Sequence, residues 1–533
     1  MKKILYILAF IILGSFFNAC VKDLDTIPID PDSETSEIIF KNPNAYTQFL
    51  AKCYSGLALG GNDGDGQGDI SGIDGGFSPY LRQYWYHQEL STDEAVIGWE
   101  DQTIKDFHYQ QWGSSDVFIA AMYARIVYQA TLVNEFLRQS EEGRLNDRGI
   151  SDEWKTKIAQ YRLEARFLRA LSYWHGLDLF GGTILVTEDD PIGEAGYFPP
   201  RVTAQEMFNF IESELLDIAP QMMASRTNEY GRVDQVAAWT LLAKLYLNAE
   251  VYIGQPKYTE CLTYENMIVG SSYALAPTWR QLFWANNDQD ESTMQEIIFP
   301  IRFDGIHERT NGGTTFIINA SIGGKMDKTD YGVPGDNGGW GGTRVTPQFV
   351  EKFDTVNDKR ATFFTDGQNL TINDINIFAD GYAYPKFVNH SIVNGDTING
   401  SDGNMCDTDF PMFRLADVYL MYAEAVLRGG AGGSTGQAIT YINDLRTRAG
   451  VSTVSEAEMT LDLILDERAR ELGWECHRRT DLIRYGMFSQ SGYVWQWKGN
   501  VKQGQSTDSK YDIFPIPDSE IRSNPNVKQN PGY

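Results

Sequence analysis

Between residues 63 and 74, oxygen-bearing side chains are spaced like the ligands of a calcium-binding loop. Asp63, Asp65 and Asp69 occupy ligand positions of such a loop, and Asp74 stands at its closing position. The closing residue is ordinarily a bidentate Glu, and the stretch after Asp74 contains Pro79, which is unsuited to the helix that should follow. Two interpretations remain open: a calcium site and, as the preferred one, a solvated turn rich in Gly and Asp.

Charged side chains are also concentrated near the C-terminus. The set consists of Arg468, Arg470, Glu471, Glu475, Arg478, Arg479, Asp481 and Arg484. Opposite charges three or four positions apart on a helix pair with each other. The spacing therefore favours a structural ion-pair network over an active site.

No catalytic motif is evident in the sequence. The six histidines (His87, His108, His175, His307, His390 and His477) lack metal-binding spacing, and there is no GxSxG motif or phosphate-binding glycine loop. A glycan hydrolase needs only two carboxylates about 5 to 9 Å apart, but nothing selects such a pair among 72 acidic residues. An enzyme is the main alternative class, and we expect no catalysis.

The N-terminus is typical of a bacterial lipoprotein. Lys2 and Lys3 precede an apolar run over 4–17, which is too short for a membrane-spanning helix, and Cys20 follows a small residue. We expect a signal peptide over 1–19, lipid attached to Cys20, and a tether over 20–40. The other cysteines, Cys53, Cys261, Cys406 and Cys476, are too scattered for a metal site, and one disulfide among them remains open.

The composition excludes one class of partner and favours another. The 45 basic and 72 acidic residues give a net charge of -27, which repels phosphate backbones, so we expect no nucleic-acid partner. The chain also contains 12 Trp, 28 Tyr and 28 Phe, several of them in Gly-rich stretches. Aromatic rings on loops suit flat ligands such as sugars.

Apolar periodicity predicts a mainly α-helical protein. We expect helices over 45–57, 118–137, 151–180, 204–218, 236–252, 415–427, 438–448 and 461–483. Small residues on several of them suit paired helices of the tetratricopeptide kind. Three stretches rich in Gly, Asn and Asp, over 59–80, 302–345 and 364–412, lack periodicity and are expected to form functional loops of a single domain over 41–533.

Ordered landmarks lie along the chain: Glu89-Leu-Ser-Thr-Asp-Glu94, Glu164-Ala-Arg-Phe-Leu-Arg-Ala170, Asp178-Leu-Phe-Gly-Gly182, Asp466-Glu-Arg-Ala-Arg-Glu-Leu472, Phe514-Pro-Ile-Pro517 and Asn530-Pro-Gly-Tyr533. Together they resemble the SusD/RagB family of outer-membrane glycan-binding lipoproteins. Further segments, Met294 to Ile298, Ser509-Lys-Tyr511 and Asn337-Gly-Gly-Trp340, are similar to the starch-binding founder of the family. At one point the chain departs from the family, since Cys476 stands where Gly is usual after Glu475.

This resemblance implies a glucan-binding site. The matching positions are Asp74, Arg82, Trp99 and Trp340, with Gln102 in place of the founder's Asn and Asn311 in place of a Tyr that stacks on sugar. Aromatic plates for ring faces and forked or charged groups for hydroxyls are what a helical α-glucan requires. The alternative for a single Trp is burial in the core.

The resemblance further implies a function without catalysis. We expect cell-surface binding of starch-like α-glucan oligosaccharides and their delivery to a TonB-dependent transporter of the SusC-like kind. In the lipoproteins that the chain resembles, acidic residues just after the lipidated cysteine, here Asp23 and Asp25, accompany export to the outer face. A different glycan and a purely structural or adhesive role are the alternatives that remain open.

Overall fold

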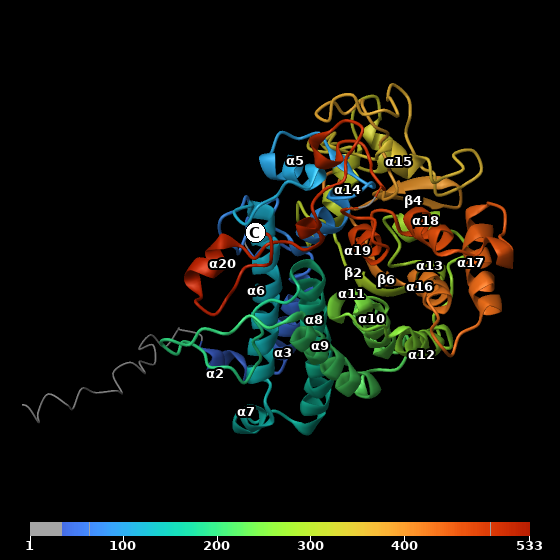
Figure 1. Cartoon of the computed structure of the whole chain (residues 1–533). Coiled ribbons are helices and arrows are strands. Elements are labelled where there is room, and N and C mark those ends of the chain that lie inside the picture. The colour runs from blue at the N-terminus through green and yellow to red at the C-terminus, as the bar shows by residue number, and fades with distance from the viewer. Residues whose placement is uncertain (1–34, 63, 65, 491) are drawn as a thin grey trace, which may run out of the picture.

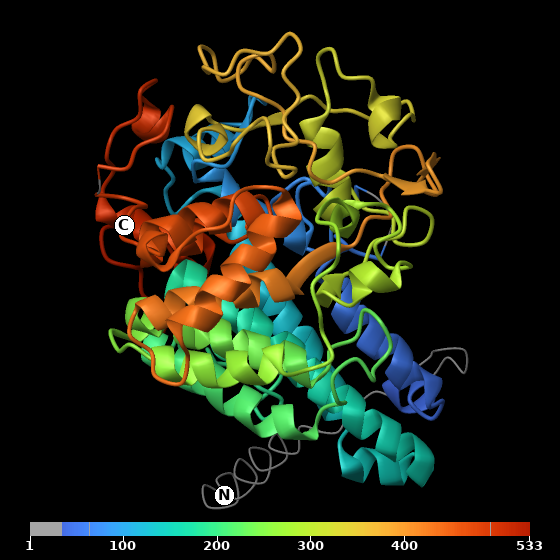
Figure 2. The same ribbon diagram turned by 90° about the vertical axis from the view of Figure 1, so that its right-hand side faces the viewer.

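The computed structural model describes residues 35–62, 64, 66–490 and 492–533. Paired helices fill the lower part of the molecule in Figure 1, and long loops gather at the opposite end around α5, α14 and α15. Figure 2, turned by 90°, shows the same division between helices and loops. The signal peptide, Cys20 and most of the expected tether lie outside the described residues, as do Asp63 and Asp65.

Helices dominate the described part of the chain. In the first half they are α2 (Ser36–Ile39), α3 (Asn44–Ser55), α4 (Tyr80–Trp85), α5 (Gln102–Tyr109), α6 (Val117–Gln139), α7 (Glu142–Asp147), α8 (Asp152–Phe180), α9 (Ala204–Ile218), α10 (Gln235–Leu247), α11 (Ala249–Ile253) and α12 (Tyr258–Val269). In the second half they are α13 (Glu291–Met294), α14 (Gly313–Ser321), α15 (Pro347–Val350), α16 (Leu415–Leu427), α17 (Thr435–Ala449), α18 (Leu461–Leu472), α19 (Arg478–Arg484) and α20 (Asp518–Ser523).

Successive long helices pack against each other as pairs. Helix α8 lies between α6 and α9, α10 packs on α12, and α16 packs on both α17 and α18. Local sequence explains the limits of α8, since the Ser151 hydroxyl accepts from the Trp154 amide at its start and Gly181 ends it with φ +67°. Helix α6 is long and apolar enough to cross a membrane, but most of it is buried in the core against α8, α3 and α4.

Short antiparallel strand pairs connect distant parts of the chain. The pairs are β1 (Val96–Ile97) with β3 (Thr343–Arg344), β2 (Ile297–Ile301) with β6 (Phe410–Arg414), and β4 (His390–Val393) with β5 (Asp396–Asn399). In the first pair Val96 lies opposite Arg344 and Ile97 opposite Thr343. This pairing joins the segment before Trp99 to the end of the expected loop region over 302–345.

Two of the predicted helices are interrupted. The helix expected over 236–252 ends at Leu247 and resumes at Ala249. The helix expected over 461–483 is α18 and α19, separated by a turn in which Trp474 and Cys476 have φ of +65° and +67°. The backbone amides of this turn donate to the side chains of Glu89 and Glu94. In a continuous helix these amides would donate to backbone carbonyls of the preceding turn instead.

The loop predictions hold only in part. The stretch over 59–80 is irregular until α4 begins, but 302–345 contains the buried helix α14, and 364–412 contains the hairpin β4–β5. Helix α14 has the composition Gly-Thr-Thr-Phe-Ile-Ile-Asn-Ala-Ser and is buried along its whole length. A helix without a polar face has no amphipathic period, which explains why the sequence did not reveal it.

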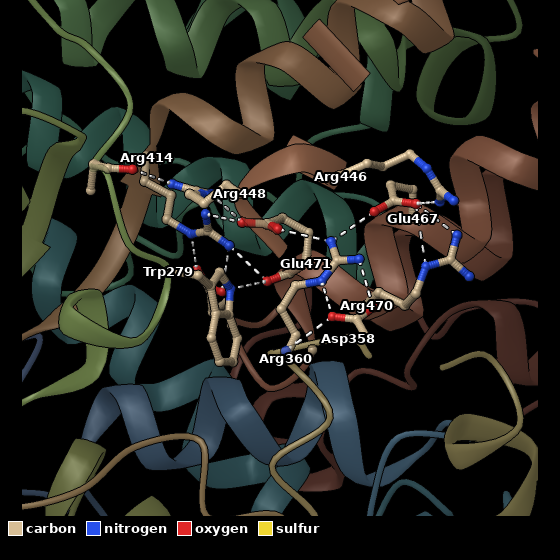
Figure 3. A network of polar contacts seen from close by, with 12 residues as sticks. Trp279, Asp358, Arg360, Arg414, Arg446, Arg448, Glu467, Arg470 and Glu471 are labelled. Atoms are coloured by element: carbon tan, nitrogen blue, oxygen red, sulfur yellow. Dashed lines mark hydrogen bonds and ion pairs between the residues drawn. The ribbon is translucent and has the colours of Figure 1, made fainter. Parts of the chain in front are cut away.

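The C-terminal charges form a structural ion-pair network, as predicted, although the network is buried instead of exposed. Glu471 contacts Arg360, Arg414 and Arg448, and Glu467 contacts Arg360, Arg446 and Arg470 (Figure 3). Arg468 and Arg484 pair with Asp417, Asp481 and Glu424 in the same way. The four described cysteines are buried free thiols.

Candidate functional site

Arg82 is at the centre of the candidate site. It lies on α4, whose first residue follows Pro79, and its side chain is buried. Its Nε donates to the Tyr86 hydroxyl at 2.9 Å, and its Nη1 donates to the carbonyls of Gly76 at 2.8 Å and Asn311 at 2.7 Å. Among the described residues Nη2 has no hydrogen-bond partner, so it remains available to a ligand.

Five aromatic rings surround the Arg82 guanidinium. Its central carbon lies 4.3 Å from the ring centre of Phe77 and 4.5 Å from that of Phe316, with Tyr86, Trp99 and Trp340 between 5.7 and 5.8 Å. A guanidinium over an aromatic face is attracted by the ring quadrupole. Burial raises the pKa of Tyr86 to about 12, and the Arg82 charge offsets part of this rise, so its hydroxyl accepts from Arg82 as a neutral group.

The two tryptophans meet because β1 pairs with β3. Trp99 follows β1 and Trp340 precedes β3, and the Gly98 amide donates to the Gly342 carbonyl at 3.0 Å. Their ring centres are 6.3 Å apart with planes tilted by 47°, and both rings are half-buried. Gly342 permits this approach, since a Cβ there would lie 2.5 Å from the Trp99 ring.

Asp74 and Asn311 lie beside Arg82, whereas Gln102 is turned to another partner. Asp74 is exposed, and its Oδ1 accepts from the Gly76 amide at 2.9 Å. Asn311 is half-buried and supplies its backbone carbonyl to Arg82. Gln102 is exposed on the first turn of α5, and its amide donates to Asp106 Oδ1 at 2.7 Å. Five of the six expected residues are thus brought together through Arg82 or the backbone next to it.

The loop that carries Asp74 is anchored by Arg125 of α6. Arg125 Nε donates to the Ser78 carbonyl at 2.7 Å, Nη2 donates to the Gly60 carbonyl at 2.6 Å, and Nη1 pairs with Asp69 Oδ1 at 2.6 Å. Asp69, one of the possible calcium ligands, is therefore engaged by a cation. The choice between a calcium site at Asp63, Asp65 and Asp69 and the preferred solvated turn stays open, since two of the three carboxylates lie outside the described residues.

Sequence reasoning missed several residues of the site. Phe77 and Phe316 back the Arg82 guanidinium, and Arg125 anchors the loop. Phe77 lies in a Gly-rich stretch, which could have indicated a loop aromatic. Phe316 belongs to α14, a helix that the apolar pattern did not predict. Together the site offers two aromatic planes, a guanidinium nitrogen and an exposed carboxylate, which are groups that pack on sugar rings and bind hydroxyls.

Comparisons with known proteins identify relatives of the chain. The SusD family model matches residues 367–533. The starch-binding protein SusD of Bacteroides thetaiotaomicron is 34% identical over 98% of this chain and 97% of that protein. A SusD-like protein of Bacteroides ovatus is 26% identical over 66% of this chain and 63% of that protein.

Solved structures share the fold. A SusD superfamily protein of Parabacteroides distasonis has a TM-score of 0.69 at 20% identity, covering 94% of this chain and 100% of that one. Surface glycan-binding protein A of Bacteroides uniformis has a TM-score of 0.66 at 20% identity, covering 91% and 98% of the two chains. These similarities confirm the predicted tetratricopeptide-like helical fold.

The chain belongs to the SusD family. Members of this family bind carbohydrate and do not catalyse its conversion, so the protein is a glycan-binding protein and not an enzyme. The family is associated with the outer membrane at the cell surface. Its ligands are oligosaccharides, and its general partners are transporters of the SusC type.

Proposed function

We propose that this protein binds starch-like α-glucan oligosaccharides at the cell surface and delivers them to a TonB-dependent transporter of the SusC type. Lipid on Cys20 would hold it at the outer face of the outer membrane. The starch-binding relative supports the choice of an α-glucan, and the arc of Trp99 and Trp340 around Arg82 is the observation that carries the proposal.

The geometry of the arc suits a curved chain of sugar rings. Two half-buried planes tilted by 47° can each cover one face of successive rings of a helical glucan. Arg82 Nη2 can donate to ring hydroxyls, and the Asp74 carboxylate can accept from them. Asn311 adds an amide beside them, and Gln102 contributes only if it leaves its partner Asp106. The proposal needs no cofactor, and calcium in the loop over 63–74 stays the alternative to a solvated turn.

Weak binding at a single site is compatible with this role. A protein tethered next to its transporter releases glycan at a high effective concentration, so handover does not require tight capture. The proposal includes the SusC-type transporter and the lipid anchor on Cys20, and it includes no nucleic-acid partner.

The test is native electrophoresis of residues 21–533 through gels that contain amylopectin, pullulan, dextran, levan or xylan. We expect amylopectin and pullulan to retard the protein. Trp99→Ala should weaken this binding by about 1 kcal/mol or more, because it removes one ring plane, while the protein stays folded. Trp154→Ala is the matched control, since Trp154 is a half-buried tryptophan near the start of α8, outside the loop end.

Each outcome separates the alternatives. Equal retardation of wild type and Trp99→Ala would remove the site assignment. Retardation by another glycan alone would keep a glycan-binding role and replace the α-glucan. No retardation by any of the five polymers would favour a structural or adhesive lipoprotein.

A further inference from the structure

A third aromatic side chain, Phe378, comes from a different loop and lies beside Gly341, which follows Trp340. A Cβ on Gly341, the residue after Trp340, would lie 4.0 Å from the Phe378 ring. The carbonyls of Ile375 and Asn376 lie 3.2 Å from the Cβ position of Gly98, the residue before Trp99. Segment 375–378 therefore adjoins the backbone of both tryptophans.

Glycines allow the Phe378 ring to lie close to the backbone. A Cβ on Gly323 would be 3.1 Å from the ring, and one on Gly324 would be 3.4 Å from it. Gly323 in turn lies against Gly341, whose Cα is 2.6 Å from the Gly323 Cβ position. The half-buried ring thus rests on two glycine segments and retains an accessible part.

Hydrogen bonds hold the segment in place. Arg344 Nη2 donates to the Ile375 carbonyl at 2.7 Å, and Arg344 Nε donates to the Asp380 carbonyl at 3.0 Å. Gln368 Nε2 donates to the Phe378 carbonyl at 3.1 Å, and the Asp380 amide donates to the Ile377 carbonyl at 3.0 Å. A ring on such a segment is positioned before a ligand arrives, which lowers the entropic cost of binding.

Polar groups adjoin the glycine segment on which the ring rests. Lys325 follows Gly324 and forms an ion pair with Asp366 at 3.0 Å, and both side chains are exposed. An exposed ion pair of this kind contributes little to stability. Lys325 and Asp366 can therefore separate and bind ligand hydroxyls at little cost in free energy. Ring, cation and carboxylate repeat the combination found at Trp99, Arg82 and Asp74.

We propose that Phe378, Lys325 and Asp366 form an outer subsite that binds an additional sugar ring of the same neutral α-glucan chain. This inference rests on the proposed function, which it extends from the inner arc to a longer oligosaccharide. The inner arc binds a short chain without the outer subsite, and only a longer chain reaches Phe378.

Calorimetric titration of residues 21–533 with maltotriose and with maltoheptaose tests the subsite. The main variant is Phe378→Leu, which keeps apolar volume and removes the flat face. We expect it to bind maltoheptaose about threefold to tenfold more weakly than wild type and to bind maltotriose equally well. Phe378→Tyr keeps the ring and should match wild type with both sugars, and Ile377→Ala, a change at the exposed neighbour, should do the same.

Other results would overturn the inference. Wild-type affinity of Phe378→Leu for both sugars would show that the ring makes no contact with glycan. An equal loss for both sugars would show that the substitution acts on the inner arc. If the wild type binds neither sugar, the proposed α-glucan function fails, and the subsite fails with it.

Discussion

Among single residues, the buried carboxyls Glu89 and Glu94 have raised pKa values. Both are buried in or just after the π-helical turn Tyr86–Leu90 that continues α4. Glu89 Oε1 accepts from the amides of Cys476 at 2.6 Å and His477 at 3.1 Å, and Glu94 Oε2 accepts from the Trp474 amide at 3.1 Å. Burial raises the pKa of Glu89 to about 7, and burial together with the Glu89 charge raises the pKa of Glu94 well above its usual range. The pair therefore retains a proton near neutral pH.

This retained proton makes stability depend on pH. The unfolded carboxyls release their protons near pH 4.5, whereas Glu89 in the folded protein keeps its proton up to about pH 7. The folded state thus binds more protons between these values, so the free energy of unfolding falls as pH rises through this window. We expect Glu89→Gln, which mimics the protonated carboxyl, to match wild type near pH 5 and to exceed it by about 1 to 3 kcal/mol at pH 8.

Urea unfolding followed by circular dichroism at pH 5, 6, 7 and 8 measures this effect. Glu142→Gln is the control, because Glu142 is exposed at the start of α7. Parallel pH dependence of wild type and Glu89→Gln would contradict a shared buried proton.

At the scale of elements, α6 determines the shape of a loop that it does not adjoin in sequence. The Arg125 guanidinium is buried and contacts Gly60, Asp69 and Ser78, close to both ends of the loop that bears Asp74. Arg125 thus supplies hydrogen-bond donors to the carbonyls of Gly60 and Ser78. The rigid helix therefore fixes the distance between the ends of the loop.

Arg125→Met should loosen this loop. We expect faster amide hydrogen exchange over 60–78 and amylopectin binding weakened about threefold or more, since Asp74 and the Gly76 carbonyl would lose their fixed positions. Hydrogen exchange with mass spectrometry and affinity electrophoresis provide the two measurements.

Arg138→Met is the matched control on the same helix. Arg138 donates to the carbonyls of Thr187 and Glu188, in a different loop. It should speed exchange over 187–190 and leave glucan binding unchanged. Unaltered exchange over 60–78 in Arg125→Met would show that the loop holds its shape without the arginine.

The sequence predicted helices wherever the determinants are local. For α8, α9 and α16 an apolar period and nearby caps or glycines set the bounds, and the predicted and observed limits nearly coincide. The break after Leu472 could not be predicted from local sequence, because the backbone amides of the turn donate to Glu89 and Glu94, which lie far away in the chain. The site residues came from family resemblance, and the role of Phe316 became visible only through three-dimensional packing.

On the scale of the whole molecule, the buried ionic network connects the C-terminal helices to the strands. Glu471 of α18 reaches Arg414 at the end of β6 at 2.8 Å, Arg448 of α17 at 2.6 Å and Arg360 of a loop at 3.0 Å. Burial acts to raise the pKa of Glu471, but the three guanidinium groups outweigh it and hold this pKa well below its usual range. One carboxylate thus compensates charges from three separate elements.

Glu471→Gln should destabilise the fold strongly. Removing one partner of a buried ionic cluster leaves uncompensated charge, which typically costs about 3 to 5 kcal/mol. Thermal and urea unfolding measure the loss, and the glucan affinity of the folded fraction should be unchanged, because the network lies apart from Arg82. Glu153→Gln, at an exposed ion pair on α8, should leave the unfolding midpoint unchanged. A loss for Glu471→Gln no larger than that of the control would show that the cluster contributes nothing to the fold.

The contribution of this ionic network to stability depends on temperature. Ions bind water with a strongly negative entropy, so the penalty for removing Glu471, Glu467 and their arginines from water falls as temperature rises. The attraction between the buried charges persists, and the network becomes more favourable in warm surroundings than in cold ones. Hydrophobic contacts weaken on cooling as well, so the C-terminal helices lose stability in the cold from both sources.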